Sequence, residues 1–255
     1  MQKKYFKLLI AFIFFTGATA QNINTDYICL YDLKFTRNDN SSDNEQFILL
    51  VESKSNKSTF LSTTIYSMNS LKETNPNDYS LYGSEFPEIV CSNNNGIDVF
   101  ENIKDFKYRY VENDKLNWEI LKEKKKVGQV NAQLARCNAY GRIWYAWFSV
   151  EIPLNYGPYK FKGLPGLIVS LYDSEKKLNF TLQNYKKKKE IYNLPKVKDY
   201  KLLTKDKYYK TRFKILTSDD GSVIFKNAEE RKKWFNVVKK RYRGQILLDI
   251  KYPQE

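Results

Sequence analysis

Two carboxylates flank a compact apolar segment at residues 163–168 and are the candidates of this sequence for acid–base chemistry. Glu151 precedes that segment, and Asp173 follows it. The sequence contains no histidine, which excludes Ser-His-Asp and Cys-His machinery and histidine-based zinc sites. A carboxylate pair that hydrolyses a polymer must have its two groups within roughly 5–10 Å of one another. We favour the alternative, in which Glu151 is an edge charge and Asp173 forms a turn at the end of a strand.

A second group of residues could bind a ligand or a partner through aromatic surfaces. Arg142 and Trp147 share one aromatic segment, where cation and ring could form a stacking site. Tyr156, Tyr159 and Phe161 follow in a short segment held by glycine and proline, and rigid aromatic side chains are good anchors for a partner. The alternative is that these rings pack on the protein's own sheet like a lid, with the arginine extending toward water.

Three cysteines, Cys29, Cys91 and Cys137, lie far apart in the sequence. In an oxidising compartment they allow at most one internal disulfide, and the sequence does not choose among the three pairs. Their spacing matches no zinc-binding pattern. We therefore expect no metal and no cofactor.

The elements that must position these residues are mostly strands. Alternation of apolar residues predicts strands over residues 27–35, 45–52, 106–111, 142–153 and 178–182. Within residues 164–167, proline and glycine occupy the second and third positions of a type II turn, where glycine would supply a positive φ. A core strand is predicted to begin directly after that turn and to end at Asp173.

Helical spacing predicts a short helix over residues 60–71 and a longer helix over residues 227–243. Asn227 can cap the longer helix, and Glu230 completes a capping box. Residues 75–95, rich in Asn, Pro and Ser, are expected to be irregular. The predicted fold is mainly β (α+β): a curved antiparallel meander sheet or half-open barrel with one or two helices packed on it.

The first residues have the pattern of a signal peptide. Lys3, Lys4 and Lys7 precede a short apolar run over residues 8–15, and residues 18–20 read Ala-Thr-Ala. The run is shorter than the roughly 20 residues that span a bilayer, and the small residues match a cleavage site. We expect residues 1–20 to be removed during export.

Residues 21–255 are then expected to form a single β-rich domain. Basic residues number 43 against 29 acidic ones, for a formal charge of +14. Because the lysines are scattered along the chain, we expect solvated surfaces and no nucleic-acid partner. No later segment is apolar enough to cross a membrane, so the expected location is the periplasm, the cell surface or the medium.

An ordered series of short motifs runs from residue 137 to residue 173. It comprises Cys137, Gly141-Arg142, Ala146-Trp147-Phe148, Glu151-Ile152-Pro153, Gly157-Pro158, Lys160-Phe161 and Gly163-Leu164-Pro165-Gly166-Leu167-Ile168. The series resembles the hallmark region of the GLPGLI family, exported proteins of diderm bacteria. The resemblance implies export and a strand-rich fold, and because the family has no established activity it implies no mechanism.

These observations favour an exported, non-catalytic protein. It would bind an envelope or outer-membrane protein partner, or an apolar ligand, through a concave sheet face or the segment 156–161. One alternative is a hydrolase that acts on envelope or extracellular polymer through Glu151 and Asp173. Another is a purely structural component of the envelope.

Overall fold

The structure is a computed structural model that describes residues 22–71, 84–113, 115–219, 221, 223–244 and 248. The predicted signal peptide over residues 1–20 lies outside these residues, as does its expected cleavage site. No helix among the described residues has the length and apolar character that a membrane crossing needs.

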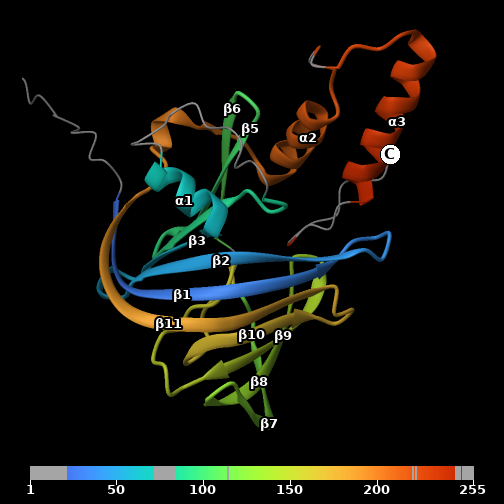
Figure 1. Ribbon diagram of the computed structural model, residues 1–255. Coiled ribbons are helices and arrows are strands. Elements are labelled where there is room, and N and C mark those ends of the chain that lie inside the picture. The colour runs from blue at the N-terminus through green and yellow to red at the C-terminus, as the bar shows by residue number, and fades with distance from the viewer. Residues whose placement is uncertain are drawn as a thin grey trace, which may run out of the picture.

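Twelve strands of the described chain form one hydrogen-bonded sheet (Figure 1). In chain order they are β1 (Asn22–Thr36), β2 (Ser42–Glu52), β3 (Lys57–Ser62), β4 (Ile89–Asn93), β5 (Gly96–Ile103), β6 (Phe106–Glu112), β7 (Glu119–Val127), β8 (Val130–Ala139), β9 (Arg142–Ser149), β10 (Leu167–Asp173), β11 (Leu178–Asn193) and β12 (Lys201–Leu202).

In space the strands follow the order β12-β6-β5-β4-β3-β2-β1-β11-β10-β9-β8-β7. Neighbouring strands are antiparallel except β12, which pairs in parallel with β6. The expectation of a mainly β, curved sheet is confirmed, and the sheet is not closed into a barrel. The order differs from a simple meander in two respects: β11 returns to lie between β1 and β10, so the first strand is central, and β12 returns to the edge beside β6.

Strand β1 separates two differently filled faces of the sheet. Cys29, Tyr31 and Leu33 point to what we call the inner face and are fully buried, as the alternation over residues 27–35 predicts. Asp32 and Lys34 point to the outer face and are half-buried and exposed, respectively. The two faces therefore offer different chemistry, apolar on one side and polar on the other.

The inner face is filled by the chain itself. Residues 150–166, which link β9 to β10, fold back over it and place six apolar side chains in the core: Ile152, Leu154, Tyr156, Tyr159, Phe161 and Leu164. Helix α2 (Lys205–Leu216) also packs there through Tyr208 and Tyr209, which are 0% and 2% exposed. The hydroxyl of Tyr31 donates to the carbonyl of Ile168 at 2.7 Å, next to an irregularity in the β9–β10 pairing.

Residues 164–167 do not form the predicted type II turn. That turn requires a positive φ at Gly166, whereas in the segment 163–168 it is Gly163 that has a positive φ, of 95°. Gly166 is required because a Cβ there would lie 2.1 Å from the carbonyl oxygen of Ser149. The predicted core strand is confirmed, since Leu167 begins β10 and is fully buried.

The outer face is covered at one end only. Helix α1 (Thr63–Leu71) and the segment after β11 close over an apolar cluster that includes Ile28, Leu50 and Tyr192. That segment contains the short helix η2 (Val197–Asp199), and another short helix, η1 (Ser53–Ser55), links β2 to β3. The remainder of this face, over β1, β2 and β11, carries polar side chains.

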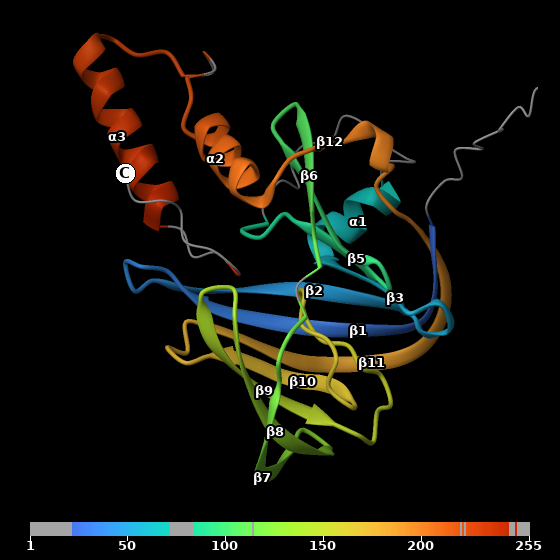
Figure 2. The same ribbon diagram turned by 180° about the vertical axis from the view of Figure 1, so that it is seen from behind.

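In helix α3 (Ala228–Gly244) Asn227 forms the predicted cap, but Glu230 bonds one residue before the position that a capping box uses. The amide of Glu230 donates to Asn227 Oδ1 at 2.9 Å, and the Glu230 carboxylate accepts from the amide of Lys226 at 2.8 Å. Figure 1 and the opposite view in Figure 2 both place α3 at the margin of the molecule, beyond α2.

Two further local predictions were wrong. The helix predicted over residues 60–71 begins only at Thr63, because Phe60 and Leu61 belong to β3. The predicted irregular stretch 75–95 contains β4, whereas its residues 75–83 lie outside the described chain.

The three cysteines are buried and free, so the disulfide considered above does not form. Cys29 lies on β1, Cys91 on β4 and Cys137 on β8, and at least two strands separate each pair. Adjacent strands are about 4.8 Å apart, so along the sheet each pair exceeds the roughly 7 Å over which a disulfide closes. Burial raises the pKa of all three thiols to about 12.

Candidate functional site

Asp173 organises a turn at the end of β10. Its side chain is 1% exposed, and Oδ1 accepts from the amide of Leu178 at 2.9 Å. Arg142, half-buried on β9, places Nε 3.3 Å from the other carboxylate oxygen. These contacts tie the β10–β11 turn to the start of β9, which is a structural role for both residues.

Glu151 lies elsewhere. It is exposed after the end of β9 and accepts from the side-chain amide of Asn131 at 2.7 Å. Along the β9–β10 ladder Leu167 pairs with Ser149 and Asp173 with Trp144. Glu151 and Asp173 therefore lie at opposite ends of the strand pair, roughly 17–20 Å apart at about 3.3 Å per residue. The structure does not bring these two carboxylates into one pocket.

The aromatic residues predicted to bind a partner are interior residues. Tyr156, Tyr159 and Phe161 are 6%, 5% and 1% exposed, and the Phe161 ring centroid lies 4.7 Å from that of Trp144. Trp147 is also buried, with the ammonium of Lys125 4.3 Å from its ring centroid. The segment packs on its own sheet, which was the alternative interpretation.

The same segment carries a buried cation that sequence reasoning missed. The Lys160 side chain is 0% exposed, and its Nζ lies 2.7 Å from a carboxylate oxygen of Glu112 and donates to the hydroxyl of Tyr110 at 2.8 Å. The rings of Tyr110, Tyr140 and Tyr159 surround it with centroids 4.9, 5.3 and 4.8 Å away. Tyr140 and Tyr159 both adopt positive φ, at 53° and 56°, a conformation that non-glycine residues hold only when their surroundings fix it.

Helix α2 is fastened to the sheet by similar pairs. Lys205 Nζ lies 2.8 Å from the second carboxylate oxygen of Glu112. Arg212 Nε donates to both oxygens of Glu101 at 2.9 and 3.0 Å, and the Tyr208 hydroxyl donates to the same carboxylate. Because all of these groups except Lys205 are almost entirely enclosed, we assign them to holding the loop and α2 in place.

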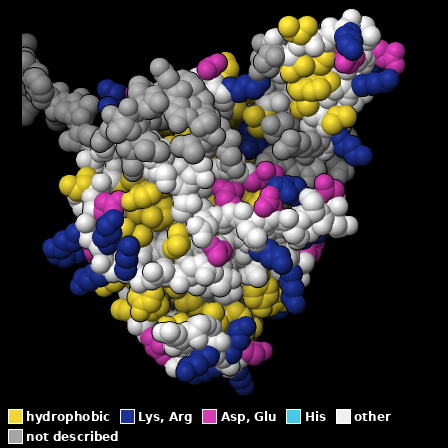
Figure 3. Space-filling view, viewed as in Figure 1, with side chains coloured by type: hydrophobic (Ala, Val, Ile, Leu, Met, Phe, Trp, Pro, Cys, Tyr) yellow, Lys and Arg dark blue, Asp and Glu magenta, His cyan; other side chains and the backbone are white. Residues whose placement is uncertain are grey.

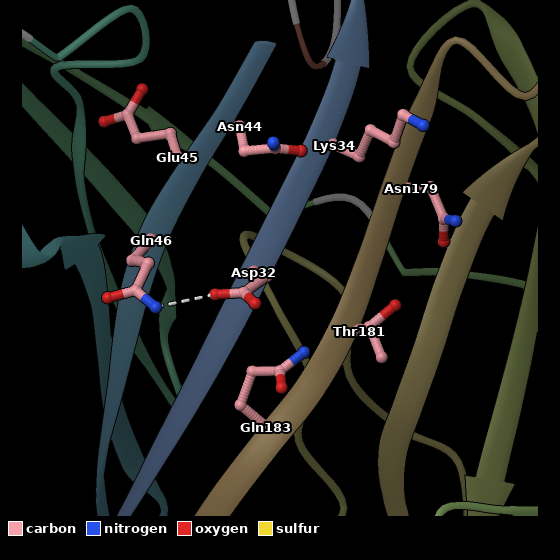
Figure 4. A pocket seen from close by; sticks show the side chains of 8 residues that line it. All are labelled: Asp32, Lys34, Asn44, Glu45, Gln46, Asn179, Thr181 and Gln183. Carbon is pink, nitrogen blue, oxygen red and sulfur yellow. Dashed lines mark hydrogen bonds between the residues drawn. The ribbon is translucent and has the colours of Figure 1, made fainter.

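An accessible site lies on the outer face, on the part that α1 leaves open. A depression of about 430 Å³ is lined by polar residues of the three central strands (Figure 4). They are Asp32 and Lys34 on β1, Asn44, Glu45 and Gln46 on β2, and Asn179, Thr181 and Gln183 on β11. Its volume is within the range of small-molecule sites.

The strand register explains why these side chains converge. Lys34 pairs with Asn44 on one side and Asn179 on the other, and Asp32 pairs with Gln46 and Thr181. Two rows of three residues therefore cross the sheet on one face, and Gln46 donates to Asp32 Oδ1 at 2.9 Å.

A bulge adds a further amide to these rows. Leu30 pairs with Asn184 and Tyr31 with Leu182, which leaves Gln183 as an extra residue on β11. Bulges re-aim side chains in this way, and often do so beside functional sites. Figure 4 shows the amide end of Gln183 between Asp32 and Thr181.

The lining offers donors and acceptors together. Amide and hydroxyl groups do both, Asp32 accepts and Lys34 donates. The buried oxygen Oδ1 of Asn179 has no hydrogen-bond partner within the described chain, and buried polar atoms of this kind are rarely left without one. The site is thus suited to a ligand that itself donates and accepts hydrogen bonds at several points.

Glu45 contributes to the rim and differs from the rest. It lies between Asn44 and Gln46 and so points toward the other face, where it accepts from the Ser84 hydroxyl at 2.5 Å and from the amide of Glu85 at 3.0 Å. Burial raises the pKa of the Glu45 carboxyl to about 7.

Sequence reasoning missed this depression, although part of its signal was visible. Asn179, Thr181 and Gln183 alternate with apolar residues, as do Asp32 and Lys34, which predicts one polar face for each strand. What the sequence did not reveal was the strand order that places β11 beside β1.

Among the described residues, no three His, Cys, Asp or Glu side chains gather as metal ligands would.

Comparison with protein families gives one match. Residues 111–170, from the end of β6 into β10, match the family model described as "Protein of unknown function (Porph_ging)". This segment contains most of the motif series beginning at Cys137. No curated protein matches the chain in sequence.

Among solved structures the fold is similar to that of PNGF-II, seen in two crystal forms. The TM-scores are 0.56 and 0.55 at 15% identity, over 76% of this chain and 34% of PNGF-II. The chain thus spans about a third of the length of PNGF-II, and the likeness concerns the fold alone. A LolA superfamily protein from Nitrosomonas europaea matches over 72% of this chain and 94% of its own, at 9% identity and a TM-score of 0.28, too low to indicate a common fold.

Proposed function

We propose that the protein is a non-catalytic binding protein that holds a neutral, polyhydroxylated ligand, such as a saccharide, in the depression on the outer face. One observation carries the proposal: seven polar side chains from three adjacent strands converge on one accessible depression, with Glu45 at its rim pointing to the other face. The half-buried side chains of Asp32, Asn179 and Thr181 form its floor, whereas Lys34, Asn44 and Gln46 are exposed around them.

The chemistry of the lining favours hydroxyl groups over other ligand groups. A hydroxyl both donates and accepts, so it can meet the amides, Thr181, Asp32 and Lys34 in turn. An apolar ligand would leave these groups desolvated without partners, at a cost of about 1–3 kcal/mol each. An anionic ligand would face the carboxylate of Asp32, the middle residue of one row, beside the ammonium of Lys34 in the other.

The other hypotheses drawn from the sequence have less support. Aromatic side chains, including Phe35, Phe47, Phe60 and Phe180, occupy the inner face where an apolar ligand was expected. The side chains expected to capture a partner, in residues 156–161, belong to the same core. A hydrolase acting through Glu151 and Asp173 would need those groups in one cleft, and the β9–β10 register separates them.

We also propose that the chain is exported and belongs with the GLPGLI proteins. The basic start, short apolar run and Ala-Thr-Ala sequence support export, and the motif series supports the family. Sequencing the N-terminus of the protein purified from a diderm host should give Gln21 as the first residue; an intact Met1 would reject export by this route.

Binding can be tested with soluble glucose-, mannose- and N-acetylglucosamine-based oligosaccharides, screened on an array and quantified by titration calorimetry. Asp32→Ala and Asn179→Ala should each weaken binding, because each removes hydrogen bonds to the ligand worth about 1–2 kcal/mol, or roughly 5- to 30-fold in Kd.

The matched controls are Asn184→Ala and Asn138→Ala, which remove exposed amides outside the depression. We expect both to bind like the unaltered protein. If none of the oligosaccharides binds, or if the control variants lose as much affinity as Asp32→Ala, the proposal is wrong.

A further inference from the structure

Helix α3 exposes apolar side chains instead of burying them. Trp234 and Val237 are 38% and 68% exposed, and Ile224 and Val223, just before the helix, are 96% and 36% exposed. Helix α2 behaves in the opposite way, with Tyr208 and Tyr209 in the core. An apolar surface of this kind on an otherwise polar helix marks an interaction site.

The apolar residues of α3 lie along one stripe. At about 100° per residue, Trp234, Val237 and Val238 fall on one side of the helix. Phe225, which precedes the helix, packs on Trp234 and Phe235 with ring centroids 5.6 and 6.1 Å apart. The stripe is therefore held in shape by its own aromatic contacts.

Lysines occupy the opposite side of the helix and its flanks. Residues 226–240 contain six basic residues and two acidic ones. Glu229 pairs with Lys233 at 3.0 Å, whereas Lys232, Lys239 and Lys240 form no ion pair within the described chain and are exposed. Figure 3 shows apolar side chains over this helix with Lys and Arg side chains at its edges.

We propose that α3 is a docking surface for an anionic lipid bilayer, and that it lies in the interface with Ile224, Trp234 and Val237 among the lipids. A basic amphipathic helix with tryptophan on its apolar side has the composition of helices that lie in the plane of a membrane. Tryptophan favours the headgroup region, and flexible lysine side chains reach from the helix toward lipid phosphates. A second copy of the same surface would bring lysines against lysines, which argues against a symmetric dimer through this helix.

The membrane-docking inference is independent of the polar depression, which lies on β1, β2 and β11.

Membrane docking can be tested by sedimenting the full protein with vesicles of phosphatidylcholine alone or mixed with phosphatidylglycerol. We expect binding to the mixed vesicles only, weakened by added salt. Removing Lys239 and Lys240 together, as Lys239→Gln/Lys240→Gln, should lower partitioning roughly fivefold per lysine.

The matched control for charge is Lys122→Gln/Lys124→Gln on the exposed strand β7, which removes the same net charge and should leave binding unchanged. For the apolar stripe, Val237→Glu should lower partitioning at least tenfold, whereas Val150→Glu should have no effect, because Val150 is 64% exposed in a turn elsewhere. Brominated lipids should quench tryptophan fluorescence, and Trp234→Phe should remove most of the quenching, since Trp144 and Trp147 are buried and Trp118 is half-buried away from α3, against Phe161.

Three results would overturn the proposal. The first is equal loss of binding in the β7 and α3 lysine variants, which would indicate net charge alone. The second is undiminished vesicle binding by Val237→Glu. The third is failure to bind the mixed vesicles; crosslinking of α3 to an acidic protein or to a second copy would then assign the surface to that partner.

Discussion

At the scale of single residues, the type of a charged residue does not reveal whether its side chain is buried. Lys160 and Asp173 are fully or almost fully buried, whereas Glu151 is exposed. All three lie in or beside the motif series, and nothing in their spacing distinguishes them. Burial of Lys160 depends on Glu112 and three tyrosines that come from separate parts of the chain. The motif series could be recognised from the sequence, but the burial of each charged residue in it could not.

Glu45 should make stability depend on pH. Burial raises the pKa of its carboxyl from 4.5 to about 7, so between these values the folded state holds a proton that the unfolded state has lost. Its contribution is therefore present below pH 4.5 and is lost as the pH rises through 7. The neutral variant Glu45→Gln should be more stable than the unaltered protein at pH 8, on the order of 1–3 kcal/mol, and no more stable at pH 4.

Urea unfolding at several pH values measures this difference. Glu123→Gln, which alters an exposed glutamate on β7, should leave the profile unchanged. Parallel profiles for the Glu45 variant and the unaltered protein would show that the carboxyl ionises at its ordinary pKa.

At the scale of elements, alternation identified strands well where the two faces differ. Strands β1 and β6 cover the predicted residues because one side of each is more apolar than the other, whereas β2 was identified from a run of apolar residues that is buried on both faces. The pattern failed at β3, where Phe60 faces one core cluster and Leu61 the other. A short strand buried on both faces produces the same run of apolar residues as a helix. Strand β4, also buried on both faces, was missed within a stretch whose composition suggested a loop.

The loop before β10 gives a second example, in which glycine is required for close approach. Alanine at position 166 would place its Cβ 2.1 Å from the Ser149 carbonyl oxygen, so Gly166→Ala should destabilise the fold by about 1–3 kcal/mol or more. Gly128→Ala is the comparison: φ is 59° there, but no atom lies within 4 Å of the added Cβ. That variant should lose only the roughly 1 kcal/mol that a left-handed alanine costs.

Thermal or urea denaturation of the two variants distinguishes the mechanisms. A smaller loss for Gly166→Ala than for Gly128→Ala would mean that the backbone of β9 moves aside easily. In that case the close packing of the loop against Ser149 would not be what selects glycine.

At the scale of the whole molecule, the candidate site arises from strand order. Asp32 and Thr181 are far apart in sequence and meet only because β11 returns beside β1. Alternation gives the polar face of each strand, but pairing between distant strands is not encoded in local periodicity. The fold class could therefore be predicted, and the binding face could not.

The buried cluster around Lys160 connects three parts of the molecule, and its energetics can be separated by a double-mutant cycle. Lys160 comes from the loop before β10, Glu112 from β6, and Lys205 from the start of α2. Breaking a buried pair from one side leaves an uncompensated charge and costs about 3–5 kcal/mol. Glu112→Gln should therefore destabilise strongly, because it leaves Lys160 enclosed. Lys160→Met should cost less, because Lys205 still faces the carboxylate.

The double variant should cost less than the sum of the two, since it removes both buried charges, and this shortfall measures the coupling. The exposed pair Arg136–Glu119, with side chains 50% and 57% exposed, serves as the control, for which a coupling below about 1 kcal/mol is expected. Urea unfolding of each variant supplies the free energies. Additive losses at Lys160 and Glu112 would mean that the ion pair does not fasten the loop to β6, and the apolar contacts of Tyr156, Tyr159 and Phe161 alone would then hold the loop against the inner face.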